Sequence, residues 1–336
     1  MDVAKLRLWL SLVVDENDYA DIKPLPNLDY KIVAGNSLLG VEKDIFNHHL
    51  FAELEELKPL YFEATKSAKK KELKDKIDAL IAQLTGNKAV FDFEIYFSEV
   101  FHKKGGFDVV IGNPPYIQLQ RNGGALADLY QNSGYKTFAR MGDIYMLFYE
   151  KGHQVLSGNG NLCFITSNKW MRAGYGKKLR KYFLTETSPK LLIDFGDAPL
   201  FENATTYTNI LLFGKKPQDT ASLVADLSTK PDLMGKLSAY LNAPKKNYVP
   251  EFGEKRYLIV DKTEAAIKQK IEERGIPLMD WDIKIYRGII TGYNKAFIID
   301  GVKRTELITE DPKSAEIIKP VLRGKDIKRY TIEKRD

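Results

Sequence analysis

The chain lacks several features that mark other classes of protein. Its 336 residues include one cysteine, Cys163, and four histidines, which excludes a disulfide framework and leaves no metal-ligand spacing. No apolar run approaches the roughly 20 residues that span a bilayer. The apolar N-terminal stretch is broken by lysine and arginine and has no small-residue cleavage site. These absences predict a cytoplasmic protein with no metal site and no membrane segment.

The charge balance is more informative locally than globally. A net charge of +6, from 51 basic and 45 acidic residues, only weakly indicates a polyanionic partner. Between Lys313 and Asp336, however, eight basic residues stand against four acidic ones. We interpret this end of the chain as a phosphate-contacting surface. The alternative is an ordinary solvated, lysine-rich surface.

The pattern of apolar residues changes along the chain. Helical spacing predicts a helix over about 2–15, and a short strand is expected at Lys31–Ala34, before Gly35-Asn36-Ser37. Two apolar stripes between residues 42 and 100 predict a helical insertion that packs on the domain. From residue 101 on, predicted strands and helices alternate: strands at 107–111, 161–166, 190–195 and 208–213, and helices at 143–156 and 172–183.

This alternation predicts an open α/β sheet that binds ligands at the carboxyl ends of its strands. The run 107–111 is almost continuously apolar, which is typical of the centre of a parallel sheet. The pattern becomes irregular after about residue 216, with helical segments expected near 219–242 and 262–274. A further region begins near Asp280-Trp281.

Asn113-Pro114-Pro115-Tyr116 is the most specific motif, because it follows Gly105-Gly106 and an apolar strand. An isolated tetrapeptide of this kind is often only a turn. Here two adjacent prolines make a rigid loop with outward carbonyl groups and no amide hydrogens. The Asn113 side-chain oxygen and the Pro114 carbonyl can accept both hydrogens of an exocyclic amine, and Tyr116 can stack on its ring. The loop is therefore suited to presenting a planar amine for methylation.

Several segments together carry a family resemblance. FDVVIGNPPYIQ, DIYMLFYEKG, NLCFITSNKW and TTYTNILLF resemble the N6-adenine DNA methyltransferases, in particular the subgroup fused into type IIG restriction-modification enzymes. AKLRLWLSLVVDE and LDYKIVAGNSLLG look like that family's helix after the second strand and its third strand. YRGIITGYNKAFIID and IIKPVLRGKDIKRY look like the start of a target-recognition region.

The resemblance implies a Rossmann-like class I methyltransferase sheet that is incomplete at the N-terminus. It divides the chain into a first part of the methyltransferase core (1–41), a helical insertion (42–100), the core with the catalytic loop (101–216), a helical spacer (217–280) and the start of a target-recognition domain (281–336). The activity implied is methyl transfer from S-adenosylmethionine to N6 of an adenine flipped out of double-stranded DNA.

The same resemblance assigns roles to single residues. Asn113, Pro114, Pro115 and Tyr116 match the catalytic loop, and Asn36, with Asn113, falls where the family meets the cofactor. Tyr207 is the candidate for the far side of the flipped base, although an ordinary exposed tyrosine explains it equally well. Asp143 and Lys169 lie in matching segments, yet a helix cap and a surface charge account for them as well. Candidates for contact with DNA are Arg287, Asn294, Arg323 and Lys325.

The chain departs from the family at the cofactor site. The glycine-containing loop that grips S-adenosylmethionine, and the acidic residue that binds its ribose, are not found in the sequence. We therefore expect a fragment that needs the N-terminal part of its own enzyme and transfers no methyl group by itself. Glu56-Leu57-Lys58 and Asp326-Ile327-Lys328 fit a carboxylate-x-lysine nuclease pattern, but surface roles are expected, so any endonuclease would lie outside this chain.

Two other functions fit the same motif. A protein-glutamine N5-methyltransferase uses the same tetrapeptide, although the basic C-terminal region argues against it. A DNA-specificity module that has lost catalysis would explain the absent cofactor loop, although an intact Asn113–Tyr116 argues against decay. Methylation of cytosine N4 is disfavoured, because that group usually has serine in place of Asn113.

Overall fold

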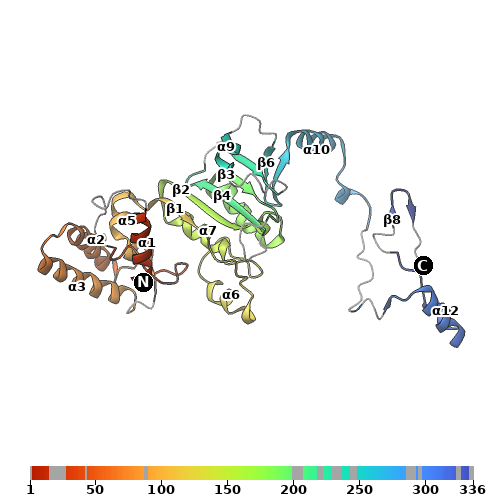
Figure 1. Ribbon diagram of the computed structural model, residues 1–336, viewed down its shortest axis with the longest axis horizontal. Coiled ribbons are helices and arrows are strands. Elements are labelled where there is room, and N and C mark those ends of the chain that lie inside the picture. The colour runs from red at the N-terminus through yellow and green to blue at the C-terminus, as the bar shows by residue number, and fades with distance from the viewer. Residues whose placement is uncertain are drawn as a thin grey trace. The chain divides into compact units, whose positions relative to one another are not determined.

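The protein is described by a computed structural model that covers residues 2–14, 28–41, 44–86, 90–198, 207–217, 222–228, 236–242, 248–284, 293, 297–322 and 327–332. The chain divides into two compact units, Met1–Lys270 and Ile271–Asp336, and Figure 1 labels their elements. Four predicted DNA contacts lie outside the described residues: Arg287, Asn294, Arg323 and Lys325. None of the described helices has the length and apolar character that crossing a bilayer requires.

A five-stranded sheet forms the centre of the first unit. Its order is β1 (Phe107–Gly112), β2 (Leu156–Ser167), β4 (Thr208–Gly214), β3 (Ser188–Asp194) and β5 (Leu223–Asp226). β1 and β2 are parallel, as are β3 and β5, whereas β4 is antiparallel to both β2 and β3. The predicted α/β sheet is confirmed, and one reversed strand makes it a mixed sheet.

Alternation along the strands separates the two faces of this sheet. Leu162 and Phe164 of β2 and Leu192 of β3 enter the main core beneath α7 (Tyr145–Gln154) and α8 (Lys177–Glu186); Figure 1 shows α7 lying along this face. On the opposite face, Ile193 packs with residues of β5 and with α9 (Leu237–Asn242). The core therefore lies mainly on the side of α7.

Two expectations about strands are wrong. β1 lies at the edge of the described sheet and not at its centre, since it pairs only with β2 among the described strands. Its outward side chains Val109 and Ile111 are 65% and 78% exposed. Lys31–Ala34 forms no strand. A strand needs a hydrogen-bonded neighbour: among the described residues β1 has one on one side only, and Lys31–Ala34 has none.

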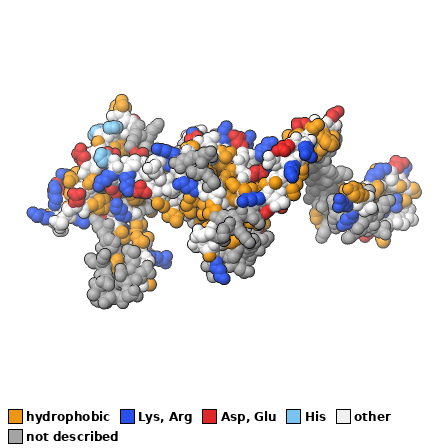
Figure 2. Space-filling model, turned by 90° about the horizontal axis from the view of Figure 1, so that it is seen from above, with side chains coloured by type: hydrophobic (Ala, Val, Ile, Leu, Met, Phe, Trp, Pro, Cys, Tyr) orange, Lys and Arg blue, Asp and Glu red, His pale blue; other side chains and the backbone are white. Residues whose placement is uncertain are grey.

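The predicted helical insertion consists of α2 (His48–Glu63), α3 (Ser67–Leu84), α4 (Phe93–Tyr96) and α5 (Ser98–Lys104), preceded by α1 (Asp2–Val14). α2 to α4 share a separate apolar core in which Leu54 and Ile77 are fully buried. α3 stops at Leu84, close to Gly86, which has a φ of +58°. Basic and acidic side chains are interspersed on the face shown in Figure 2.

Lys58 contradicts the surface role expected for the Glu56-Leu57-Lys58 triplet. Its side chain is fully buried, and its ammonium group donates hydrogen bonds to the carbonyl oxygens of Ile95 (3.0 Å) and Tyr96. The carboxylate of Glu99 lies 3.6 Å away. Lys58 therefore joins α2 to α4 and α5, which is a structural role.

The C-terminal part of the first unit adds a hairpin to the sheet region. β6 (Tyr248–Phe252) and β7 (Tyr257–Asp261) pair antiparallel, and Tyr257 is fully buried in the main core. α10 (Lys262–Arg274) matches the predicted helix. Within 219–242 the structure has β5 as well as α9, so the expectation of helix alone is wrong there: Val224 and Ala225 are apolar and buried on opposite faces of the sheet.

The second unit contains short elements. They are a single 3-10 turn, η6 (Leu278–Asp280), the helices α12 (Gly301–Glu310) and α13 (Ser314–Ile317), and the antiparallel pair β8 (Ile327–Lys328) and β9 (Thr331–Ile332). The Asp300 side chain caps α12 by accepting a hydrogen bond from the Lys303 amide.

Candidate active site

The loop that follows β1 is fixed at its entrance by two glycines. Gly105 ends α5 in the left-handed conformation, with a φ of +68°. Gly106 has a φ of +145°, and a Cβ atom there would meet the Val155 carbonyl oxygen at 2.6 Å. Only glycine fits where the chain passes so close to a neighbouring backbone. The Phe107 amide then donates to the same Val155 oxygen (2.9 Å) and starts the pairing of β1 with β2.

The residues of the tetrapeptide differ in how far they are buried. Pro114 is buried, Asn113 and Pro115 are exposed, and Tyr116 is half-buried. The Tyr116 ring packs edge-on against Tyr145, with ring centroids 6.1 Å apart. Burial raises the pKa of Tyr116 to about 12, so its hydroxyl stays protonated at neutral pH. The Asn113 side chain is thus available to a ligand while Tyr116 is held from behind.

A cavity of about 620 Å³ opens beside this loop. Its lining comes from four segments that are distant in sequence: the end of the tetrapeptide with the chain after it, one residue shortly before α7, the end of β2 with the turn that follows it, and the residue before β4. The lining residues are Tyr116, Gln118, Gln120, Arg121, Asp143, Ser167, Lys169 and Tyr207. The cavity therefore lies at the carboxyl ends of β1 and β2, where an α/β sheet binds its ligands.

Two aromatic residues that the sequence singled out line this cavity together. Tyr116 comes from the loop after β1, and Tyr207 directly precedes β4 and is 48% exposed. The Tyr207 carbonyl accepts a hydrogen bond from the Asn168 amide (2.9 Å), which fixes its backbone against the end of β2. Asn113 and Asn36 are not among the lining residues.

Asp143 has a different role from the helix cap considered above. The N-cap position of α7 is Ile144, and no side chain caps that helix. Asp143 instead pairs with Gln118 in an isolated antiparallel bridge. Its buried carboxylate accepts a hydrogen bond from the Tyr175 hydroxyl (3.0 Å). Asp143 is thus a buried anion of the cavity.

A buried polar network holds the two strand ends that border the cavity. The Asn209 side-chain oxygen accepts from the Thr166 hydroxyl (3.1 Å) and from the Trp170 indole N–H (3.2 Å). The hydroxyls of Tyr149 and Thr166 also lie 2.9 Å apart. Sequence reasoning missed this network. The available signal was that Thr166 and Asn209 lie next to apolar runs of β2 and β4, where a polar group is buried only when it is hydrogen-bonded.

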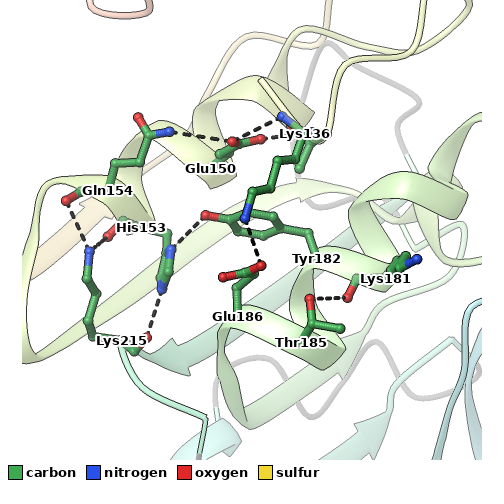
Figure 3. Close-up of polar contacts among 10 residues, drawn as sticks. Lys136, Glu150, His153, Gln154, Lys181, Tyr182, Thr185, Glu186 and Lys215 are labelled. Atoms are coloured by element: carbon green, nitrogen blue, oxygen red, sulfur yellow. Dashed lines mark hydrogen bonds and ion pairs between the residues drawn. The ribbon is translucent and has the colours of Figure 1, made fainter. Parts of the chain in front are cut away.

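A second network, drawn in Figure 3, orders the segment that leads to Asp143. The Glu150 carboxylate on α7 accepts hydrogen bonds from the backbone amides of Lys136 (3.1 Å) and Thr137 (2.8 Å). One helical turn along, His153 contacts the Tyr182 hydroxyl through Nδ1 (2.7 Å) and the Lys215 carbonyl through Nε2 (2.8 Å). α7 is thereby tied to α8 and to the end of β4.

Asn36 lies in a separate neighbourhood. Its amide nitrogen donates to the Tyr130 hydroxyl (2.8 Å), and its oxygen accepts from the Leu38 amide (3.2 Å). Leu38 packs with Leu119 in a small apolar cluster. The Asn36 segment therefore rests on the chain that follows the tetrapeptide.

The described residues do not form a complete pocket for S-adenosylmethionine. Asn36 and Asn113 are its two expected contacts, and both are exposed. Gly35 and Gly40 lie in irregular chain and not in a strand–turn–helix junction. The described residues therefore do not fit the whole cofactor.

Comparison with known proteins identifies the family of the chain. The family described as Eco57I restriction-modification methylase matches residues 1–201, and the chain belongs to this family. The type II methyltransferase M.PaeR7I of Pseudomonas aeruginosa is 30% identical over 207 residues, which are 59% of this chain and 36% of that protein. RM.Eco57I of Escherichia coli, a type II restriction enzyme and methyltransferase, is 35% identical over 119 residues, 34% of this chain and 12% of that protein.

M.BstVI of Geobacillus stearothermophilus, also a type II methyltransferase, is 29% identical over 219 residues, 58% of this chain and 37% of that protein. The chain thus spans little more than a third, or less, of these relatives. None of the three is named as a protein-glutamine methyltransferase, so that alternative is not favoured.

Proposed function

We propose that this chain is the base-binding half of an adenine-specific DNA methyltransferase of a type II restriction-modification system, acting in the cytoplasm on N6 of an adenine extruded from double-stranded DNA. The observation that carries the proposal is the shared cavity of Tyr116 and Tyr207, beside an exposed Asn113. Two aromatic rings on one cavity suit a planar base, and each stacking contact contributes about 1–3 kcal/mol.

The catalytic loop supplies the chemistry at the amine. The Asn113 side-chain oxygen and the Pro114 carbonyl accept the two N6 hydrogens, because neither group can donate at those atoms. Accepting both hydrogens draws the nitrogen lone pair out of conjugation with the ring. The nitrogen would then be the nucleophile: as its bond to the methyl carbon forms, the bond from that carbon to the sulfonium sulfur of the donor would break, and the cationic nitrogen would afterwards release one proton. In this class of enzyme the methyl donor is S-adenosylmethionine.

We propose that the cofactor half docks on the uncovered side of β1. Val109 and Ile111 of β1 are exposed on the face opposite α7. Ile111 pairs with Cys163 of the neighbouring strand β2. We call Val109, Ile111, Cys163 and Ile165 the open sheet face. An apolar strand with an open edge and an uncovered face is a liability unless another polypeptide covers it. The partner is therefore a segment that adds a strand beside β1 and an apolar layer over this face.

The test uses the protein purified from its native host with whatever polypeptide accompanies it. Labelled methyl transfer from S-adenosylmethionine is measured on unmethylated DNA and on a protein substrate in parallel. Label is expected in DNA adenine and is expected to be lost with Asn113→Ala, while the fold, followed by circular dichroism, is unchanged. Label in protein alone would assign the glutamine class. Salt-sensitive DNA binding without any transfer would make the chain a specificity module.

A further inference from the structure

Two cations line the cavity without an ion-pair partner in the described part of the chain. Arg121 follows the tetrapeptide loop, and Lys169 follows β2; both are exposed. Neighbouring cations are matched by acids: Arg140 with Asp128 at 2.7 Å and Arg172 with Asp194 at 4.0 Å. The two cavity cations therefore differ from the interspersed surface charges around them.

Local structure fixes the backbone positions from which these two side chains extend. After Arg121 the backbone makes a turn in which Asn122, Gly123 and Gly124 have φ values of +55°, +73° and +91°. A Cβ atom at Gly124 would meet the Arg140 guanidinium at 3.1 Å. Glycine adopts such φ values without strain and asparagine tolerates them, so the sequence Asn122-Gly123-Gly124 is suited to this turn.

Lys169 is placed by its neighbours in the same way. It lies in the 3-10 helix η3 (Asn168–Met171), and its amide donates to the Ser167 hydroxyl (3.4 Å). The next residue, Trp170, is fully buried and bonded to Asn209. Arg121 and Lys169 thus belong to two segments that are held in place separately, and both side chains line the same cavity.

The anion in the cavity is not their counterpart. Asp143 is buried and bonded to the Tyr175 hydroxyl, whereas both cations are exposed. A base that enters between Tyr116 and Tyr207 takes its sugar with it, and the phosphates on either side must stay near the exposed boundary. Phosphate oxygens form strong, charge-assisted hydrogen bonds with both arginine and lysine.

We propose that Arg121 and Lys169 form a phosphate-binding subsite that holds the backbone phosphates flanking the extruded nucleotide. This inference rests on the proposed function, which supplies the identity of the base as adenine. It requires no bases to be read, so it serves any sequence that surrounds the target adenine.

The test compares two probes, adenosine and adenosine 3′,5′-bisphosphate, by titration calorimetry on the full chain. The bisphosphate is expected to bind the unmodified protein about tenfold more tightly or better, and this advantage is expected to shrink as salt rises. Arg121→Ala/Lys169→Ala should remove the advantage and leave adenosine binding unchanged. Lys178→Ala, which removes an exposed lysine of α8 outside the cavity, is the matched control. Lys169→Arg should keep the advantage because it keeps the charge.

The outcomes separate the subsite from the base pocket. No binding of the bisphosphate, or an equal advantage in the double variant, overturns the phosphate subsite. Bisphosphate binding that depends on Arg121 and Lys169 without any adenosine binding supports the subsite and contradicts the base pocket. All variants replace exposed side chains, and thermal unfolding confirms that each is folded.

Discussion

Gln118 and Asp143 pair as an isolated antiparallel bridge, although 25 positions separate them in the chain. The bridge is framed by two backbone hydrogen bonds, from the Leu119 amide to the Gly142 oxygen (2.9 Å) and from the Ile144 amide to the Ile117 oxygen (2.8 Å). The chain after the catalytic loop is thereby attached to the start of α7. Because both bridge residues line the cavity, this pairing holds together two of the segments that form the cavity wall.

The Tyr175 hydroxyl is expected to stabilise this arrangement through Asp143. Burial, and secondarily the Asp143 charge, raise the pKa of Tyr175 to about 12, so the hydroxyl is a donor at neutral pH. Tyr175→Phe leaves the buried carboxylate without that donor and should lower the free energy of unfolding by about 1–3 kcal/mol. Urea denaturation of the two proteins measures this difference in the free energy of unfolding. Tyr207→Phe, also at the cavity, is the control and should change stability by less than about 0.5 kcal/mol; equal losses would refute the role of Tyr175.

His153 should make the fold sensitive to acid. Burial lowers the pKa of His153 below its ordinary value of 6.5. The unfolded chain therefore binds a proton near pH 6.5, whereas the folded chain does so only at lower pH. The contribution of His153 to the free energy of unfolding is therefore fully present above pH 6.5, where the imidazole is neutral in both states. This contribution decreases as the pH falls below 6.5.

The measurement compares the unmodified protein with His153→Gln by urea denaturation from pH 7.5 downward. The stability difference between the two should shift in favour of the variant below pH 6.5. His48→Gln, at an exposed position of α2, controls for the removal of an imidazole. A difference independent of pH would show that His153 titrates normally.

Lys58 gives the opposite kind of pH dependence. Burial lowers the pKa of Lys58 to about 8, although Glu99 opposes the shift. Between pH 8 and the ordinary value of 10.5, the unfolded chain holds a proton that the folded chain has released. The free energy of unfolding should therefore rise with pH across this window, by about 3 kcal/mol in total.

Lys58→Met isolates that effect. The variant loses the hydrogen bonds to Ile95 and Tyr96 at every pH, which is a constant cost. The slope of the stability difference between pH 8 and 10.5 then reports the titration of Lys58 alone. Lys71→Met, at an exposed position of α3, should show no such slope. A flat difference for Lys58→Met would mean that its ammonium group is not destabilised by burial.

The sequence allowed much of the sheet and part of the site to be predicted, for reasons that particular residues make clear. β2, β3, β4 and α10 follow from local apolar patterns, and the place of Asn113–Tyr116 after β1 follows from the apolar run before it. The bridge from Gln118 to Asp143 and the bonds to Asn209 are long-range pairings that no local pattern encodes. The burial of Lys58 was missed because its hydrogen bonds go to backbone carbonyl groups, which every residue type has, and its one acidic neighbour, Glu99, is 41 positions away in the sequence.

The two wrong strand predictions have one physical cause. An apolar run predicts a strand covered on both faces, and Phe107–Gly112 has that composition. In the described structure one face of β1 packs on the core through Val110, and the other exposes Val109 and Ile111. The composition of β1 thus matches a sheet with more layers than the described residues provide. Lys31–Ala34 also has strand-like residues, but no strand among the described residues pairs with it.

Substitutions on the open sheet face test what covers it. Val109→Lys/Ile111→Lys places two charges on side chains that are already exposed, so the free energy of unfolding of this chain alone should change by less than about 1 kcal/mol. The same charges would be buried by a docking cofactor half, at a cost of several kcal/mol. Copurification of the partner polypeptide, and methyl transfer with it, should therefore be lost.

The matched control places the same charges on an exposed surface elsewhere. Leu60 of α2 and Leu184 of α8 are 53% and 40% exposed, and Leu60→Lys/Leu184→Lys should retain the partner and the transfer. Retention of both by Val109→Lys/Ile111→Lys would show that the cofactor half docks elsewhere. Arg121 and Lys169 line the cavity, and neither Val109 nor Ile111 does. DNA binding through the two cations should therefore survive in the open-face variant, which separates loss of the partner from loss of the substrate site.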